Sequence, residues 1–330
     1  MSKASEIETL LDALREKTEA LRKALEVSFV GQEEAVDLLL FCLLCSGNPL
    51  LEGTPGLGKT TLVKGLASAL SLSFQRIQFT PDLMPADILG ARILEEASSG
   101  GHSFRFEPGP IFANLVLADE INRATPRAQS ALLEAMQEKQ VTLFGESRPL
   151  PMPFCVIATQ NPIELEGTYP LPEAQLDRFL CKIEIPTPTH KELCEILTRT
   201  TQTQAASPVG VMGQEDLIAL GNLVREVSAS SDRIEEVARL VRATDPNAEN
   251  APSDIRSLLR FGSSPRGGQA VLMLAKARAL INGRPWIVEE DIEAVAAPAL
   301  RHRLIFSYEG EASGVSADAL VAQALAAARA

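Results

Sequence analysis

Histidine is scarce in this chain, which has only three in 330 residues. His102, His190 and His302 are widely separated, and no recognisable motif adjoins any of them. Histidine-based metal sites and nucleophilic pairs need the imidazole close to further ligands or to a nucleophile. The sequence therefore gives no signal for a histidine metal centre or a nucleophilic triad.

Cysteine is also sparse, and its count of five is odd. Cys42 and Cys45 form a C-x-x-C pair, but the pair lies within an apolar helical run. No second pair or histidine cluster completes a zinc set. We expect buried free thiols rather than a metal site or a redox pair, and this favours the cytoplasm as the compartment.

Long hydrophobic runs are absent, so the sequence predicts no membrane span. The first residues are polar and charged, which argues against a signal peptide. The net charge of −12 argues against a broadly basic surface for nucleic acid, although a local basic stripe stays possible. The chain is 45% hydrophobic and 22% charged, which is typical of a globular protein with two domains or one extended domain.

Residues 53–60, GTPGLGKT, match the phosphate-loop pattern of nucleotide-binding proteins. An apolar run at 49–51 precedes the loop and a helix-forming run at 61–67 follows it, which is the strand–loop–helix context that the motif requires. A glycine-rich turn without a ligand is the alternative, and this context argues against it.

The residue types of the loop suit a phosphate ligand. Gly53, Gly56 and Gly58 are expected to adopt positive φ and to let the backbone approach a ligand. The N–H groups of the loop and the positive end of the following helix face an anion. We expect Lys59 to reach the β- and γ-phosphates and the Thr60 hydroxyl to bind Mg²⁺.

Two further buried runs end in polar residues. Residues 115–118 are apolar and lead into Asp119 and Glu120. Ligands bind at the carboxyl ends of parallel strands, so Asp119 is placed to hold Mg²⁺ through water and Glu120 to polarise an attacking water. The run at 154–159 leads to Asn161, which we expect to contact that water or the γ-phosphate. Without the phosphate loop, these residues would indicate only a surface acidic pair and a turn.

Alternating strands and helices predict an α/β fold with a parallel sheet and right-handed crossovers. An amphipathic helix at 5–26 comes first. Two hairpins are expected, around 98–101 and 145–146; the first is interpreted as an insertion that contacts a partner, with a sheet extension as the alternative. The predicted strands are 49–51, 74–79, 115–120, 154–159 and 181–185.

From Pro186 onward helical periodicity dominates, which indicates a second, α-helical domain after a 187–189 linker. We place the boundaries at residues 1–28 for the N-terminal helix, 29–187 for the α/β core and 188–330 for the helical domain. Arg266 begins one of its helices. The helical runs are predicted at 190–202, 214–229, 232–243, 253–260, 265–282 and 289–299, with a loop and an alanine-rich helix over 309–330.

Five stretches together make a family resemblance specific. The chain resembles the MoxR family of AAA+ ATPases from about Phe29 to Ile305. The stretches are LADEINRA at 117–124, QSALLEAMQE at 129–138, ATQNP at 158–162, LPEAQLDRF at 171–179 and SPR at 264–266. The resemblance implies an AAA+ P-loop NTPase sheet flanked by helices and followed by an α-helical lid domain.

The resemblance also implies a role for each matching position. Asp119 and Glu120 look like the Walker B pair, and Asn161 resembles sensor 1. Arg178 resembles an arginine finger that acts on the neighbouring subunit, and Arg266 resembles sensor 2, expected to act within its own subunit. The remaining nucleotide-binding positions are the adenine strip Val30, Gly31 and Gln32, and the loop residues Thr54, Pro55, Gly56, Leu57, Gly58, Lys59, Thr60 and Thr61.

By the same resemblance the protein is expected to be a ring, a hexamer, that hydrolyses ATP with Mg²⁺ and remodels or activates a protein client. The partner expected from the family carries a von Willebrand factor A domain on a separate chain, and the two hairpins are expected to face the central pore. A nucleic-acid motor is one alternative, which DNA-stimulated hydrolysis would reveal. A chelatase-type motor subunit is another, which a co-purifying partner would separate. A non-enzymatic nucleotide-binding scaffold is the third, and the presence of Glu120 and Asn161 argues against it.

Overall fold

The computed structural model describes residues 16–25, 30–96, 102–161, 167–201 and 210–330. A parallel five-stranded sheet lies at its centre, in the order β2-β5-β8-β1-β9. The strands are β1 (Pro49–Glu52), β2 (Phe74–Gln78), β5 (Leu115–Asp119), β8 (Cys155–Gln160) and β9 (Cys181–Glu184). This confirms the expected parallel α/β fold, with every predicted strand within one or two residues of its observed ends.

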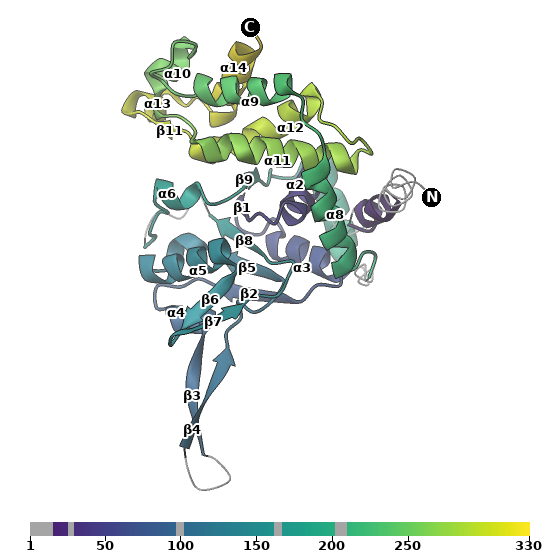
Figure 1. The fold of residues 1–330 in the computed structure, drawn as a ribbon, viewed down its shortest axis with the longest axis vertical. Coiled ribbons are helices and arrows are strands. Elements are labelled where there is room, and N and C mark those ends of the chain that lie inside the picture. The colour runs from purple at the N-terminus through teal and green to yellow at the C-terminus, as the bar shows by residue number, and fades with distance from the viewer. Residues whose placement is uncertain (1–15, 26–29, 97–101, 162–166, 202–209) are drawn as a thin grey trace.

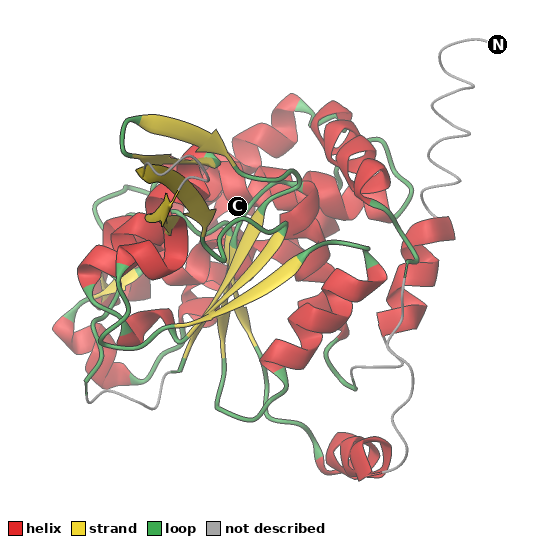
Figure 2. Cartoon of the chain, turned by 90° about the horizontal axis from the view of Figure 1, so that it is seen from below, coloured by secondary structure: helices red, strands yellow, loops and turns green. Residues whose placement is uncertain are grey.

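Alternate residues of the central strands face two separate apolar layers. On β5, Leu115 and Leu117 pack with one core cluster, whereas Val116 and Ala118 pack with the other. Helices therefore cover both faces of the sheet, as Figure 2 shows. The helices of this part are α2 (Glu33–Leu44), α3 (Lys59–Ala69), α4 (Pro85–Leu89), α5 (Pro126–Glu138) and α6 (Glu173–Leu176), with the 3₁₀ turn η1 (Ile121–Arg123).

Two antiparallel hairpins leave this part of the fold, and β3–β4 projects away from the body (Figure 1). They are β3 (Gly90–Glu96) with β4 (His102–Pro108), and β6 (Gln140–Leu143) with β7 (Glu146–Pro149). The hairpins touch each other: the Arg92 guanidinium lies 4.7 Å from the centre of the Phe144 ring, and that of Arg148 lies 4.3 Å from the centre of the Phe106 ring. Both predicted hairpins are confirmed, although the turn at 97–101 lies outside the described residues.

The chain after β9 is mainly helical, as predicted. The sequence did not predict the small antiparallel pair of β10 (Leu259–Phe261) and β11 (Ile305–Phe306). Because β10 begins at Leu259, the helix predicted over 253–260 ends two residues early. The helices are α7 (His190–Thr201), α8 (Gln214–Glu226), α9 (Ser231–Ala243), α10 (Ser253–Leu258), α11 (Pro265–Ile281), α12 (Glu289–Leu300), α13 (Tyr308–Ser313) and α14 (Ala317–Arg329), with the 3₁₀ turn η2 (Arg301–Arg303).

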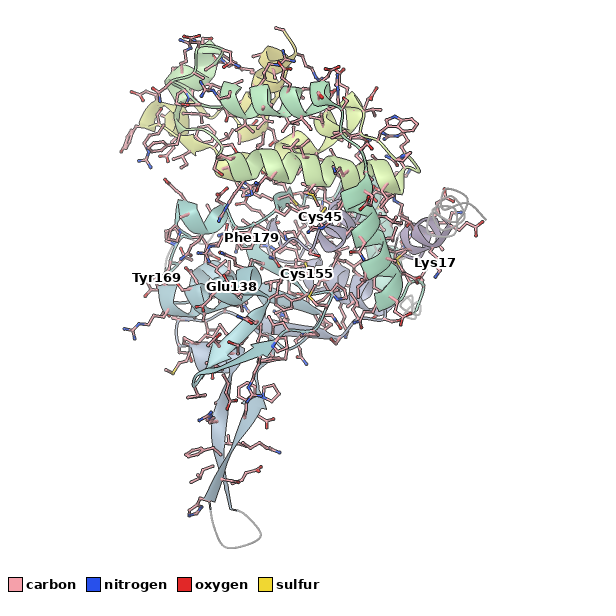
Figure 3. The ribbon with its side chains drawn as sticks, viewed as in Figure 1. Lys17, Cys45, Glu138, Cys155, Tyr169 and Phe179 are labelled. Atoms are coloured by element: carbon pink, nitrogen blue, oxygen red, sulfur yellow. The ribbon has the colours of Figure 1, made fainter. Side chains whose placement is uncertain are left out.

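The turn η2 docks the helical part onto the edge strand β9. Arg303, almost fully buried, donates to the Asp177 carboxylate at 2.9 Å and to the Phe179 carbonyl at 2.7 Å. At the other end of β9, Arg301 lies 3.6 Å from the Glu184 carboxylate. Phe179, labelled in Figure 3, is fully buried in the core cluster that also contains Leu132 and Leu133 of α5. These charged contacts position the helical part along the whole length of β9.

Between β5 and α5 the chain forms the 3₁₀ turn Ile121–Arg123, so α5 begins at Pro126. The predicted N-terminal helix is seen over residues 16–25, and its first part lies outside the described residues. In the described part, Lys17 pairs with Asp216 at 2.7 Å and Arg22 pairs with Asp37 at 2.7 Å, so the helix bridges α2 and α8.

Candidate nucleotide site

The phosphate loop forms an open cradle between β1 and α3. Gly56 and Gly58 have φ of 85° and 76°, and a Cβ added at either would meet nothing within 4 Å. The two glycines are therefore required for conformation, and the space beside them is left for a ligand. Gly53 was expected to share the positive φ but does not; its Cα instead packs close to Ile185, where an added Cβ would lie 3.1 Å from the Ile185 Cβ.

The start of α3 is suited to bind an anion. Gly58 is its N-cap and has no side chain to satisfy the first N–H groups of the helix. A phosphate group would take these N–H groups and the positive end of the helix dipole. Thr60 and Thr61 lie in this first turn, and Thr54 and Pro55 lie in the loop before it.

Lys59 at present closes the loop on itself, because its Nζ donates to the Gly53 carbonyl at 2.6 Å. Burial lowers the pKa of its ammonium group, while the negative charges of Asp119, Glu120 and Glu52 oppose the shift. A bound phosphate would add negative charge beside this ammonium group and favour its charged form.

Asp119 ends the buried strand β5 and is itself buried. Its Oδ1 accepts from the Thr159 hydroxyl at 2.6 Å, and its Oδ2 accepts from the Arg76 guanidinium at 2.6 Å. A carboxylate at the end of a strand next to the phosphate loop fits a Mg²⁺ site, since Mg²⁺ takes oxygen ligands and keeps several waters.

Glu120 follows Asp119 in a left-handed conformation with φ of 57°, which is uncommon for a residue with a Cβ and typical of functional sites. Its backbone N–H donates to the Thr159 hydroxyl oxygen at 2.8 Å. Its carboxylate accepts from Gln78 at 2.9 Å and from Arg123 at 3.0 Å. The carboxylate is thus held in place from two neighbouring elements.

Thr159 and Arg76 were not among the predicted site residues. Thr159 is fully buried, and one hydroxyl both donates to Asp119 and accepts from the Glu120 amide. The signal available in the sequence was a polar residue near the end of the apolar run that leads to Asn161. Arg76 gave no signal, because its contact with Asp119 spans 43 positions of the chain.

Asn161 lies directly after β8, on the strand next to β5, and is 5% exposed. The sheet therefore brings Asp119, Glu120 and Asn161 to the same edge as the phosphate loop, as the sequence predicted. The residue that follows, Pro162, lies outside the described residues.

The predicted adenine strip borders a pocket of about 630 Å³ beside the carboxyl end of β9. Gly31 and Gln32 line it, together with Ile185 and Thr187. Gln32 also donates to the Leu57 carbonyl of the phosphate loop at 3.3 Å, which ties the strip to the loop. Val30, half-buried, directly precedes these two residues.

Arg178 and Arg266 lie together, but away from the phosphate loop. Both line a hollow of about 380 Å³ that also includes Asn48 and Leu180, the residues just before β1 and β9. Arg266 lies 3.9 Å from the Asp177 carboxylate, next to Arg178. The hollow is therefore at the amino ends of these strands, whereas Lys59 follows the carboxyl end of β1.

This placement does not fit the expectation that Arg266 acts on the nucleotide of its own subunit. The length of β1 separates the hollow from the loop, and four residues of strand span about 13 Å. The reason is the docking of the helical part along β9, which sets the start of α11 beside Asp177: the Ser264 hydroxyl donates to the Asp177 carboxylate at 3.0 Å.

Two family models match the chain: one described as ATPase family associated with various cellular activities (AAA), over residues 48–181, and one described as AAA lid domain, over residues 251–328. The chain is 42% identical to the chaperone MoxR1 of Mycobacterium tuberculosis, over 90% of this chain and 78% of that protein. It is 30% identical to the protein MoxR of Methylorubrum extorquens, over 90% of each. The chain belongs to the MoxR family of AAA+ ATPases.

Two further comparisons agree with this assignment. The uncharacterised protein YeaC of Bacillus subtilis is 41% identical over 90% of each chain. A solved structure of a candidate ATPase from Cytophaga hutchinsonii superposes with a TM-score of 0.91 at 38% identity, covering 99% of this chain and 98% of that one. This MoxR-family chain is accordingly an ATP-binding ATP hydrolase related to chaperones. None of the helices within its described residues has the length and apolar character of a membrane span.

Proposed function

We propose that this MoxR-family ATPase assembles into a hexameric ring and uses Mg²⁺-dependent ATP hydrolysis to remodel or activate a client protein. The observation that carries the ring is the separation of Arg178 and Arg266 from the phosphate loop. A head-to-tail contact brings one end of a subunit to the opposite end of the next, and such contacts form a ring when the rotation between subunits closes. Each hollow then supplies two arginines to the neighbour's nucleotide.

The residues around the phosphate loop fit ATP and Mg²⁺. Thr60 and Asp119 would hold the metal ion, which supplies positive charge beside the phosphates when bound. Lys59 and the loop N–H groups bind and orient the phosphates. Glu120 is the residue that polarises the attacking water, and Asn161 positions that water. Phosphoryl transfer depends mainly on this kind of positioning and charge neutralisation.

The arginine pair explains how hydrolysis is coupled to motion. An arginine contributed by a neighbour can be worth about 10³–10⁵ in rate. Arg266 belongs to α11 and Arg178 precedes β9, so loss of the γ-phosphate in one subunit releases contacts to both parts of the next.

The hairpins are the proposed contact with the client. Leu94 and Phe104 of the projecting hairpin are 57% and 69% exposed, and Phe144 of the second hairpin is 59% exposed. The two hairpins also contact each other, so they can act as one apolar surface facing the pore. We further propose that the protein acts in the cytoplasm with a partner that carries a von Willebrand factor A domain. The proposed domain limits lie near residues 28 and 187.

The decisive experiment is the ATPase rate per subunit as a function of protein concentration, with sedimentation velocity at each concentration, with and without ATP. A rate that rises as larger species form supports a site shared between subunits. A constant rate from a monomer would refute the ring. Addition of DNA tests the alternative: stimulation by DNA would favour a nucleic-acid motor over a protein remodeller.

A further inference from the structure

The side chain of Gln129 on α5 is fully buried and ties two stretches of backbone to that helix. Its Nε2 lies 3.1 Å from the carbonyl oxygen of Ile121, 3.2 Å from that of Ala124 and 3.0 Å from that of Tyr169. The opposite orientation of the amide would turn its oxygen towards three carbonyl oxygens, so the nitrogen must face them. One side-chain donor group therefore serves three backbone acceptors.

Two of these acceptors belong to the turn that follows Glu120. Ile121 begins η1, and Ala124 is the residue that ends it. The backbone N–H of Arg123 in this turn donates to the Glu120 carbonyl at 2.9 Å, and its guanidinium donates to the Glu120 carboxylate at 3.0 Å. A residue with a Cβ keeps a left-handed conformation, such as the φ of 57° at Glu120, only where its surroundings hold it. The conformation of Glu120 thus depends on η1.

The third acceptor, Tyr169, lies on the chain that follows Asn161 (Figure 3). The Tyr169 backbone N–H donates to the Asn122 carbonyl of η1 at 2.6 Å, so this segment contacts the turn directly as well as through Gln129. Gln129 therefore lies where the chain after Glu120 meets the chain after Asn161.

We propose that Gln129 is a positioning residue for ATP hydrolysis, which fixes η1 and, through η1, the direction of the Glu120 carboxylate. The inference rests on the proposed catalytic role of Glu120. The Gln129 amide bonds backbone carbonyls, so it acts through the turn and not on the substrate. Removing this donor leaves buried carbonyl oxygens without a partner, which is costly unless the turn shifts to find new donors. A shifted turn moves the carboxylate away from the water that it has to polarise.

Gln129→Met keeps the approximate size of the side chain and removes its donor. We expect kcat for ATP hydrolysis to fall about 10- to 100-fold while KM for ATP stays within about twofold of the wild type, because a displaced catalytic group slows the chemical step and leaves the phosphate loop intact. Circular dichroism gives the melting temperature of each variant and shows whether it is folded.

The matched control is Asn114→Leu, at the amino end of β5. The Asn114 amide is also buried and ties two stretches of backbone together, since its Nδ2 donates to the Pro153 carbonyl at 3.0 Å and its Oδ1 accepts from the Ser73 N–H at 3.2 Å. Asn114→Leu should lower the melting temperature as Gln129→Met does but keep the wild-type kcat. An equal loss of kcat in both variants would mean that Gln129 contributes only to stability.

Gln129→Glu gives a second test, which also decides the matter if Gln129→Met does not fold. The introduced carboxyl group faces the same carbonyl oxygens, so it can donate only when it is protonated, and both burial and these oxygens raise its pKa. Its kcat relative to that of the wild type should rise several-fold as the pH is lowered from about 8 to about 6, at a temperature at which both proteins are folded. A ratio that does not change with pH would overturn the inference.

Glu120→Gln separates this inference from the proposed function. Wild-type turnover in Glu120→Gln would overturn the catalytic role of Glu120 and, with it, the reason for positioning that carboxylate. Loss of turnover in Glu120→Gln together with a wild-type kcat in Gln129→Met would overturn only the role of Gln129.

Discussion

The Arg76 guanidinium on β2 lies 2.6 Å from the carboxylate of Asp119 on the neighbouring strand β5. The same guanidinium bonds Gln78, which in turn holds the Glu120 carboxylate. Both acidic residues of the site are therefore tied to β2. A positive charge already beside Asp119 opposes the arrival of another cation.

We expect Arg76→Met to lower the Mg²⁺ concentration needed for half-maximal ATP hydrolysis. Removing one positive charge near the metal site is worth roughly a fivefold change at the effective dielectric of a partly exposed pair. The measurement is a Mg²⁺ titration of the ATPase rate at fixed ATP. Arg105→Met, on the projecting hairpin, is the control and should match the wild type; an unchanged Mg²⁺ dependence in Arg76→Met would show that Arg76 does not influence the metal.

Glu120→Gln should keep ATP binding and lose turnover by about 10²–10⁴, because an amide cannot take a proton from the attacking water. Binding can be followed with a fluorescent ATP analogue and turnover by phosphate release. Glu107→Gln, exposed on β4, serves as the control. Turnover near the wild-type level in Glu120→Gln would remove this residue from the catalytic role.

Arg178→Ala and Arg266→Ala should both bind ATP and hydrolyse it slowly, and each should regain activity when mixed with Lys59→Ala. In a mixed ring, a subunit with an intact Lys59 can face a Lys59→Ala neighbour whose arginines are intact. The readout is the ATPase rate of the mixture relative to the two separate proteins. No rescue would count against arginines acting between subunits.

Mixing Arg178→Ala with Arg266→Ala distinguishes the two possible sites of action of Arg266. If both arginines serve the neighbour, every site in the mixed ring lacks at least one of them and no activity returns. If Arg266 served its own subunit, an Arg178→Ala subunit beside an Arg266→Ala neighbour would have a complete site. ATPase activity regained in this mixture would therefore indicate that Arg266 acts on the nucleotide of its own subunit.

Stability should fall on acidification because of His302. Burial, together with the Arg303 guanidinium 2.8 Å from its Nε2, holds the pKa of His302 well below its ordinary value. The unfolded chain then binds a proton near pH 6.5 that the folded chain does not. This contribution is full above about pH 6.5 and is lost below it, by at most about 1.4 kcal/mol per pH unit.

The free energy of unfolding, measured by urea titration between pH 7.5 and pH 5, tests this expectation. His302→Asn should show a weaker dependence on pH than the wild type, whereas His102→Asn, at an exposed position of β4, should keep the wild-type slope. Equal slopes in the wild type and His302→Asn would mean that another group accounts for the acid sensitivity.

Short-range sequence patterns were sufficient to predict where much of the candidate nucleotide site lies. The strand–loop–helix context fixes where Lys59 and Thr60 lie, because the loop directly follows its strand. The apolar runs before Asp119 and Asn161 predict buried parallel strands, and the carboxyl ends of such strands meet at one edge of the sheet. These inferences need only short-range sequence and the general rules of parallel sheets.

The tertiary structure alone decided the contacts between distant parts of the chain. Thr159 and Arg76 reach Asp119 from strands about 40 positions away, and the pairing of those strands depends on the packing of the whole core. The position of Arg266 depends on how η2 docks against β9, through a buried Arg303 that no local pattern reveals. The sequence therefore determined which chemistry the chain carries, while the docking of its helical part determined that Arg178 and Arg266 lie near the amino end of β1, opposite to their own phosphate loop.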